Sequence, residues 1–180
     1  MQSLRSYKKP VNNTLGVILF FSFWAGLILA GFSINLYEAT FIPWYIPVLI
    51  YVVPALVLSP LVLKTLFRER PRYVIAKCFI LTIGNVAGLG GILLYAFMAV
   101  NFYDVDNSKV STQKLPIIAR GFNKYKTSTV PYVLVKYKNL VKDFQCPYDN
   151  STVYEFHDLK VAVNRGYFGF DVVKKVDFLK

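Results

Sequence analysis

The residue types best suited to metal binding or acid–base chemistry meet in one short stretch, residues 155–158. Glu155 lies two positions before His157, the single histidine of the chain. A carboxylate and an imidazole offer two ligands, whereas zinc in proteins takes three or four, and no second histidine completes the set. We therefore expect no metal site and interpret His157 as a residue of a surface loop.

Cys146 is the other candidate for chemistry, because a thiol becomes a nucleophile when a base such as His157 folds beside it. The second cysteine, Cys78, begins an apolar run, so no disulfide is expected. We interpret Cys146 as a small buried apolar residue. The sequence contains no P-loop, G-x-G-x-x-G, G-x-S-x-G or H-E-x-x-H motif. It therefore predicts no catalytic residues, no cofactor and no enzyme.

The composition points to a membrane protein. Hydrophobic residues make up 55% of the 180 residues and charged residues only 17%, against roughly 25% charged in soluble domains. Three apolar runs, 15–36, 44–63 and 78–100, contain no charged residue. About 20 helical residues cross a bilayer core of ~30 Å. We expect three transmembrane helices at approximately 15–36, 44–66 and 75–102, the second of them kinked at Pro54.

Beyond residue 103 the pattern changes to a mixed, charged surface with thirteen basic and eight acidic residues. Apolar residues alternate with polar ones, which is typical of strands. The expected strands are a first one at 115–119, a hairpin of 130–137 with 140–146 around Lys138-Asn139, and a second hairpin of 159–163 with 168–172. Residues 152–155 match a capping box, which favours one helical turn.

These patterns predict two domains. Residues 1–103 form a domain of three transmembrane helices, and residues 104–180 form a small β-rich domain. About five strands in this length suggest a sheet or barrel of SH3-like or OB-like size. A domain so small buries little surface, so we expect the membrane surface or a neighbouring protein to cover part of it.

The charges that flank the apolar runs predict the orientation. Basic residues concentrate before the first run and between the second and third runs, and such segments stay in the cytoplasm. The N-terminus is therefore expected in the cytoplasm of a bacterial cell and the β-rich domain outside its inner membrane. The basic residues of the second loop could also bind anionic lipid headgroups at the membrane surface. They are Lys64, Arg68, Arg70, Arg72 and Lys77.

Small residues mark one face of the third run. Gly84 and Gly88 form a G-x-x-x-G pair, Gly91 follows on the same face, and Asn85 is the strongly polar residue of the run. Gly26 and Ala30 give the first run a similar face. Such faces allow helices to approach closely, either within the chain or against a partner or second copy. On this assignment, leucine at Gly88 is expected to disrupt packing more than leucine at Gly90.

Without a catalytic set, interaction is the expected role. The first hypothesis is an accessory or adaptor subunit of a larger membrane complex, with the β-rich domain as its interaction module. The alternative is a membrane-anchored defence or immunity protein whose β-rich domain binds a toxin or small ligand, including a nucleotide-sensing effector if that domain is cytoplasmic. The expected partners are the lipid bilayer and other membrane subunits or further copies of the chain, and no nucleic acid.

Overall fold

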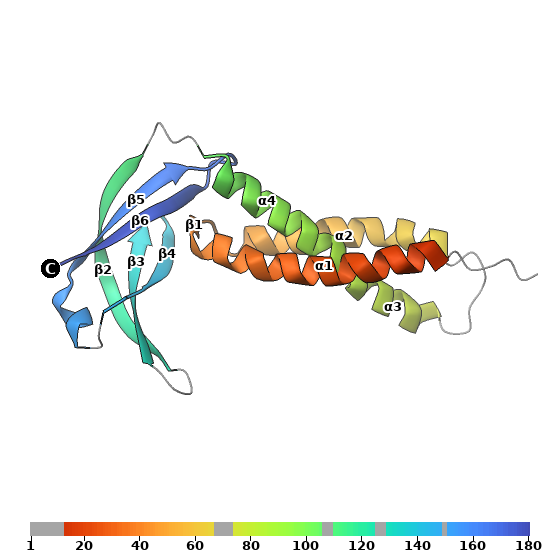
Figure 1. Cartoon of the computed structure of the whole chain (residues 1–180), viewed down its shortest axis with the longest axis horizontal. Coiled ribbons are helices and arrows are strands. Elements are labelled where there is room, and N and C mark those ends of the chain that lie inside the picture. The colour runs from red at the N-terminus through yellow and green to blue at the C-terminus, as the bar shows by residue number, and fades with distance from the viewer. Residues whose placement is uncertain (1–12, 67–73, 106–109, 125–128, 149–150) are drawn as a thin grey trace, which may run out of the picture. The chain divides into compact units, whose positions relative to one another are not determined.

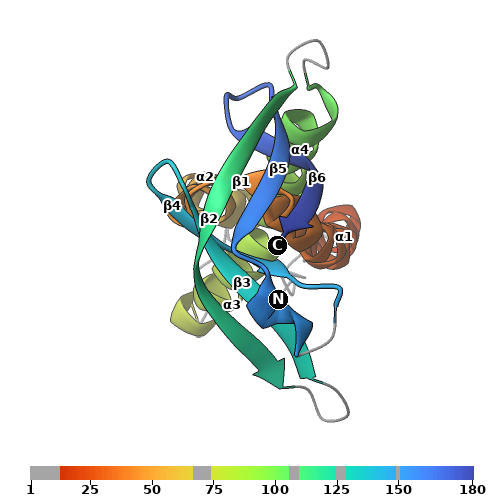
Figure 2. The ribbon, with the colours of Figure 1, turned by 90° about the vertical axis from the view of Figure 1, so that its left-hand side faces the viewer.

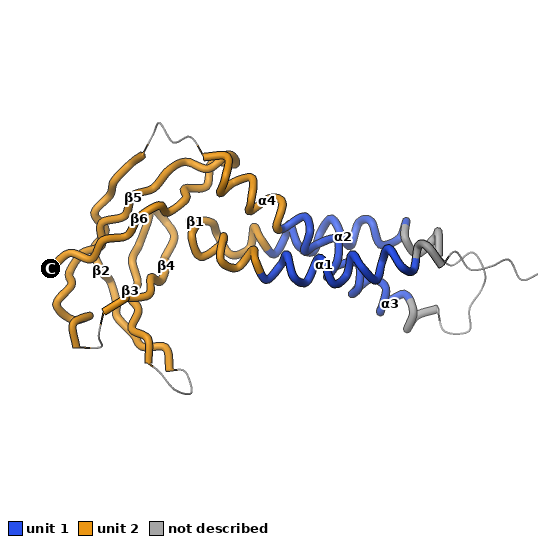
Figure 3. The backbone as a smooth tube through the Cα atoms, viewed as in Figure 1, with its two compact units in different colours: residues 1–31, 48–94 blue, residues 32–47, 95–180 orange. Residues whose placement is uncertain are grey.

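The structure is a computed structural model, and its chain divides into two compact units. One unit comprises residues 1–31 and 48–94, and the other comprises residues 32–47 and 95–180 (Figure 3). The first contains helices, and the second contains a β-barrel with the helix ends attached to it. The residues that the structure describes are 13–66, 74–105, 110–124, 129–148 and 151–180.

The apolar runs form helices, as the sequence predicts. The third run is one helical rod in three parts, because a single π-helical turn separates two α-helical segments. The elements are α1 (Asn13–Glu38), α2 (Tyr45–Leu66), α3 (Val74–Asn85), the π turn η1 (Val86–Gly90) and α4 (Gly91–Tyr103) (Figure 1). By length and composition, Gly16–Glu38 and Cys78–Tyr103 are able to cross a membrane, and Tyr45–Leu61 is a shorter apolar helix.

Helix α2 continues through Pro54 and Pro60. Each proline removes one backbone donor from the helix. Next to Pro60, the Ser59 hydroxyl donates a 2.7 Å hydrogen bond to the carbonyl of Ala55 one turn earlier. The Asn85 amide donates to the same carbonyl at 2.9 Å and to Ser59 Oγ at 3.1 Å. Through these bonds, three buried polar groups find hydrogen-bond partners inside an apolar unit: the Ser59 hydroxyl, the Ala55 carbonyl and the Asn85 amide.

The second unit contains a nearly closed, six-stranded antiparallel β-barrel. The strand order in the sheet is β1-β6-β5-β2-β3-β4, so β1 and β4 are its two edges. Figure 2 shows the long strand β2 crossing the sheet, with β5 beside one half of it. A 3-10 turn, η2 (Thr152–Glu155), precedes β5. The strands are β1 (Thr40–Phe41), β2 (Ser111–Lys124), β3 (Thr129–Tyr137), β4 (Leu140–Gln145), β5 (Asp158–Arg165) and β6 (Asp171–Leu179).

The long strand β2 curls the sheet. Its first half pairs with β5 and its second half with β3, and the register shifts between Ile117 and Ala119. Such a bulge bends a strand and increases its twist. The curl brings the apolar faces of the strands around one core, in which Val133, Val135 and Leu159 are completely buried.

Three details differ from the sequence-based expectation of five strands. The sixth strand, β1, lies in the loop between the first two helices, where two residues pair with the start of β6. Strand β6 begins at Asp171 rather than at 168, because residues 166–170 form a longer loop with Gly169 at φ +84°. The helical turn at 152–155 is present, but no side chain caps it.

Candidate functional site

The two edge strands of the barrel, β1 and β4, face each other without joining, and we call the gap between them the seam. Among the described residues, no backbone ladder connects the two strands. Aromatic side chains fill part of the seam: Phe41 of β1 stacks on Tyr137, with ring centroids 4.1 Å apart, and meets Phe144 of β4 at 6.0 Å.

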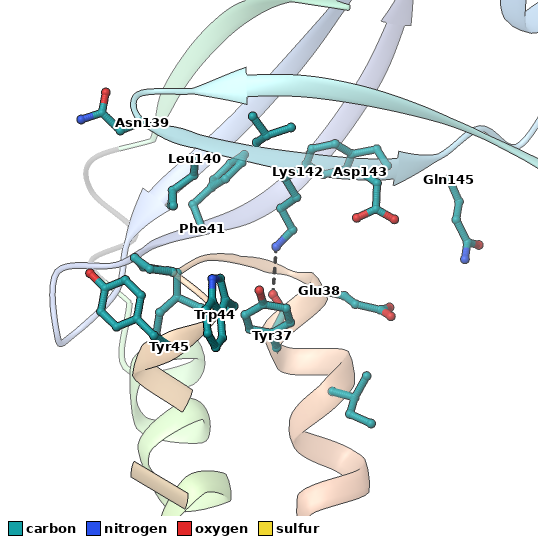
Figure 4. A pocket seen from close by; sticks show the side chains of 15 residues that line it. Tyr37, Glu38, Phe41, Trp44, Tyr45, Asn139, Leu140, Lys142, Asp143 and Gln145 are labelled. Carbon is teal, nitrogen blue, oxygen red and sulfur yellow. Dashed lines mark hydrogen bonds between the residues drawn. The ribbon is translucent and has the colours of Figure 1, made fainter. Parts of the chain in front are cut away.

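Lys142 crosses the seam from β4. Its Nζ donates to the carbonyl oxygen of Thr40 at 2.5 Å. It also donates to the carbonyl oxygen of Tyr37 at 2.8 Å (Figure 4). Helix α1 ends at Glu38, so the Tyr37 carbonyl lies in the last turn of the helix, where a positive charge is favoured, and the Thr40 carbonyl belongs to β1. The rings of Tyr37 and Phe41 lie 5.4 Å and 5.5 Å from the same nitrogen. Lys142 therefore fastens strand β4 to the end of α1.

Burial changes the acidity of this lysine. Desolvation lowers the pKa of Lys142 from 10.5 to about 8, and the nearby carboxylates of Asp143 and Glu38 oppose that shift. The direction follows because low dielectric surroundings disfavour the charged form. The ammonium remains the main form at neutral pH, where it is held by two carbonyl oxygens.

A cavity of about 770 Å³ opens beside Lys142, and we call it the seam groove. Glu38 and Asp143 border it on one side of the lysine, and Trp44 and Tyr45 on the other (Figure 4). Trp44 is 71% exposed and Tyr45 50% exposed. The remaining lining residues are Ile34, Tyr37, Phe41, Ile42, Pro43, Asn139, Leu140, Val141, Phe144 and Gln145.

The two carboxylates of the groove have no partner in the described part of the chain. Neither Glu38 nor Asp143 forms an ion pair or a side-chain hydrogen bond there, although the protein carries a formal net charge of +11. Lys142 does not neutralise them directly, since its hydrogen bonds go to backbone carbonyls. The groove is thus locally acidic in a basic protein.

A second bridge ties β3 to β6. The Tyr137 hydroxyl donates to Asp171 Oδ2 at 2.8 Å, and Lys138 Nζ lies 2.6 Å from the same oxygen. Desolvation first, and then the bond to Asp171, raise the pKa of Tyr137. The bond to Asp171 also raises the pKa of Lys138. This bridge holds the β3–β4 hairpin in place at the rim of the groove.

The residues singled out for chemistry do not come together in a site. His157 is exposed, and its Nδ1 lies 3.0 Å from the carbonyl oxygen of Glu155. Cys146 is buried in the barrel core. Among the described residues, no three His, Cys, Asp or Glu side chains are grouped so that they could hold a metal ion.

Most of the small residues singled out in the apolar runs meet inside the helical unit. A Cβ added to Gly26 would lie 2.1 Å from the carbonyl oxygen of Gly88, and one added to Gly91 would lie 2.0 Å from that of Gly26. Ala30 is half-buried. Gly84 lies outside this contact, because an added Cβ meets no atom within 4 Å.

Gly90 lies in a close contact that the spacing argument did not assign to it. An added Cβ there would lie 2.1 Å from the Tyr51 carbonyl oxygen of α2, whereas the nearest atoms to one at Gly88 are 3.1 Å away. The structure therefore contradicts the expectation that leucine at Gly90 is milder than leucine at Gly88. Gly88 lies against Ser22 and Phe23 of α1, whereas Gly90 lies against α2, so the face opposite the G-x-x-x-G pair is also a close helix contact.

The basic cluster of the second loop lies mostly outside the described residues. Arg68, Arg70 and Arg72 lie outside the described residues, and for Lys64 and Lys77 only the helical backbone is described. Its expected role at the membrane surface stays a prediction.

Lys142, Glu38 and Trp44 are not among the site residues that the sequence predicts. One signal was present: Lys142 shares the inward-facing alternation of Leu140 and Phe144, so a charged residue occupies a position that the pattern predicts to be apolar. Comparison with protein-family models, with curated proteins and with solved structures finds no match.

Proposed function

We propose that this protein is a non-enzymatic accessory subunit of a larger membrane complex, which binds another subunit through the seam groove of its barrel. The observation that supports this role is the groove itself. It joins exposed aromatic rings with a strand edge and two carboxylates that have no partner among the described residues. Aromatic residues are enriched where proteins bind one another.

The surface of the helices supports an anchored protein. In the most apolar window of α1 only 11% of the residues are buried, and in that of the third helical rod 28%. The core helix of a soluble protein would be mostly buried. Large side chains such as Phe20, Phe21 and Ile28 are more than half exposed. In a bilayer these faces would contact lipid, and we place the protein in the inner membrane of a bacterial cell.

The charges flanking the apolar runs support an N-terminus in the cytoplasm and a barrel outside it. Protease added to intact spheroplasts is expected to digest the barrel and to spare loop 64–77. Cleavage within the Arg68–Arg72 segment, with the barrel intact, would reverse this orientation.

Purification from native membranes in mild detergent tests the accessory role. The expected particle is heavier than the 20.6 kDa chain with its detergent and contains a second protein in fixed ratio. A monomer that retains no partner under conditions that preserve other membrane complexes would contradict the proposal. A homo-oligomer alone would identify a self-contained assembly instead.

The size of the groove favours a second candidate, a membrane-anchored defence protein whose barrel binds a toxin or a small ligand. A volume of about 770 Å³ lies within the range of small-molecule sites, ~300–1,000 Å³. A toxin or nuclease gene beside this one would favour that role, and an envelope or respiratory operon the accessory role. A nucleotide sensor would require a cytoplasmic barrel, which the spheroplast experiment tests.

A further inference from the structure

The free edge of β4 has a defined set of hydrogen-bonding groups. Tyr137 and Leu140 flank the two-residue turn of the β3–β4 hairpin, and they form the first pair of the ladder. In an antiparallel ladder, hydrogen-bonded and non-hydrogen-bonded pairs alternate. Leu140, Lys142 and Phe144 therefore point their backbone groups toward β3. The bond from the Cys146 N–H to the Pro131 carbonyl, 2.8 Å, continues the same alternation.

The backbone groups of Val141, Asp143 and Gln145 consequently point away from β3, along the side of β4 that borders the seam groove. Within the described chain, no backbone hydrogen bond satisfies them. An edge of this kind is a template for another extended chain. Strand β1 does not fill the role, because its two residues pair with β6.

From these features we propose that the seam groove binds an extended polypeptide segment with a lysine or arginine side chain, which adds as a further strand to the edge of β4. This rests on the proposed function and specifies its partner. Backbone bonds to Val141, Asp143 and Gln145 provide affinity, as in other strand-addition complexes. Three alternate residues match a bound segment of about five to six residues.

The carboxylates argue for a basic segment. Glu38 and Asp143 border the groove without ion-pair partners in the described chain, and both act electrostatically on Lys142. A cationic side chain between Glu38 and Asp143 would contact two negative charges in place of water. The exposed face of Trp44 offers the same cation a favourable aromatic contact. An acidic segment would meet both carboxylates, and two of the three N–H donors of Lys142 are already bound to backbone carbonyls.

Binding of synthetic peptides to the full-length protein in nanodiscs tests the proposal. The probe is a labelled, acetylated heptapeptide of alternating valine and lysine, and its relatives carry glutamate in place of lysine or proline in place of the central valine. The lysine peptide is expected to saturate the protein, with at least tenfold weaker binding of both relatives. Equal binding of all three would overturn the proposal.

Two kinds of variant localise the binding. Val141→Pro removes a backbone donor that faces the groove and spares the ladder with β3, as proline does on sheet edges. It is expected to abolish peptide binding. Glu38→Gln and Asp143→Asn are each expected to weaken binding about fivefold. Asp177→Asn, on β6, is the matched control and should leave binding unchanged.

Other occupants give different results. If native mass spectrometry finds a lipid in the groove that Val141→Pro leaves bound, and the peptides do not bind, the occupant is a headgroup and the proposal is wrong. A dimer that Val141→Pro dissociates would identify a second copy and also overturn it. If wild type and Val141→Pro retain the same subunit in native membranes, the accessory role stands and the strand-addition proposal fails.

Discussion

Lys142 Nζ lies 2.5 Å from the carbonyl oxygen of Thr40, so the charged end of a strand residue holds the opposite edge of the same sheet. Most barrels close through backbone bonds between their first and last strands. Here a side chain makes the connection, and the backbone groups on the outer side of β4 have no hydrogen-bond partner in the described part of the chain. The same residue that fastens the barrel therefore leaves the groove open.

The burial of Lys142 predicts a pH dependence of stability. Its pKa is about 8 in the folded protein and 10.5 as the ordinary value, so between these pH values the unfolded chain holds a proton that the folded protein has released. The free energy of unfolding is therefore expected to rise with pH from about 8 toward 10.5. Below pH 8 both states are protonated, and this contribution becomes constant.

Other lysines and tyrosines titrate in the same range, so the measurement compares wild type with Lys142→Met. Thermal unfolding in detergent should show the rise in wild type and a flatter profile in the variant. The chain has two tryptophans, and Trp44 lines the groove. In a Trp24→Phe background, tryptophan fluorescence therefore reports on Trp44 alone. Identical pH profiles for the two proteins would show that Lys142 is not buried as described.

Glycine packing in the helical unit predicts that alanine at Gly26 lowers the stability of the protein, whereas alanine at Gly31, also on α1, does not. Gly26→Ala would place a Cβ 2.1 Å from a backbone oxygen of Gly88, so the helices must separate. We expect a loss of about 1–3 kcal/mol, typical of overpacking. Gly31→Ala is the control, because nothing lies within 4 Å, and alanine favours the helix by up to ~1 kcal/mol. Equal melting temperatures would contradict the contact.

Part of this architecture was predictable because it depends on local patterns. Uncharged apolar runs predict helices whatever they contact, and the alternation around Lys138-Asn139 predicts the β3–β4 hairpin that the structure contains. Strand β1 was not predictable, since two residues in a helix–helix loop carry no periodicity and pair with β6, far along the chain. The seam and the role of Lys142 depend on β1, so they were missed with it.

The polar contact between α2 and α3 predicts a measurable coupling. Asn85 donates to Ala55 and Ser59, and all three residues are buried. Asn85→Leu is expected to cost roughly 0.5–1.5 kcal/mol of stability, the range of a typical intramolecular hydrogen bond. Ser59→Ala should cost less, because the bond to the Ala55 carbonyl remains. Strictly additive effects in the double variant would mean that Asn85 and Ser59 do not interact.

Asn101 predicts how the loop before β6 is held. Its side chain is 1% exposed; Oδ1 accepts the Phe168 N–H at 3.1 Å, and Nδ2 donates to the Phe170 carbonyl at 3.3 Å. Asn101→Ala leaves two backbone groups without these partners, which costs about 1–3 kcal/mol where such groups are buried. In Asn101→Ala the loop keeps the stacking of Phe168 on Phe97, whose ring centroids are 4.6 Å apart. This contact alone is expected to hold the loop less tightly than the contact and the Asn101 hydrogen bonds together.

Limited digestion with chymotrypsin measures this loosening, because Tyr167 is 64% exposed beside the contact. Cleavage after Tyr167 should accelerate at least tenfold in Asn101→Ala. Asn101→Asp keeps the acceptor for Phe168 and loses the donor to Phe170, so its cleavage rate should lie between those of wild type and Asn101→Ala. Unchanged cleavage in both variants would show that the loop is held without the Asn101 amide.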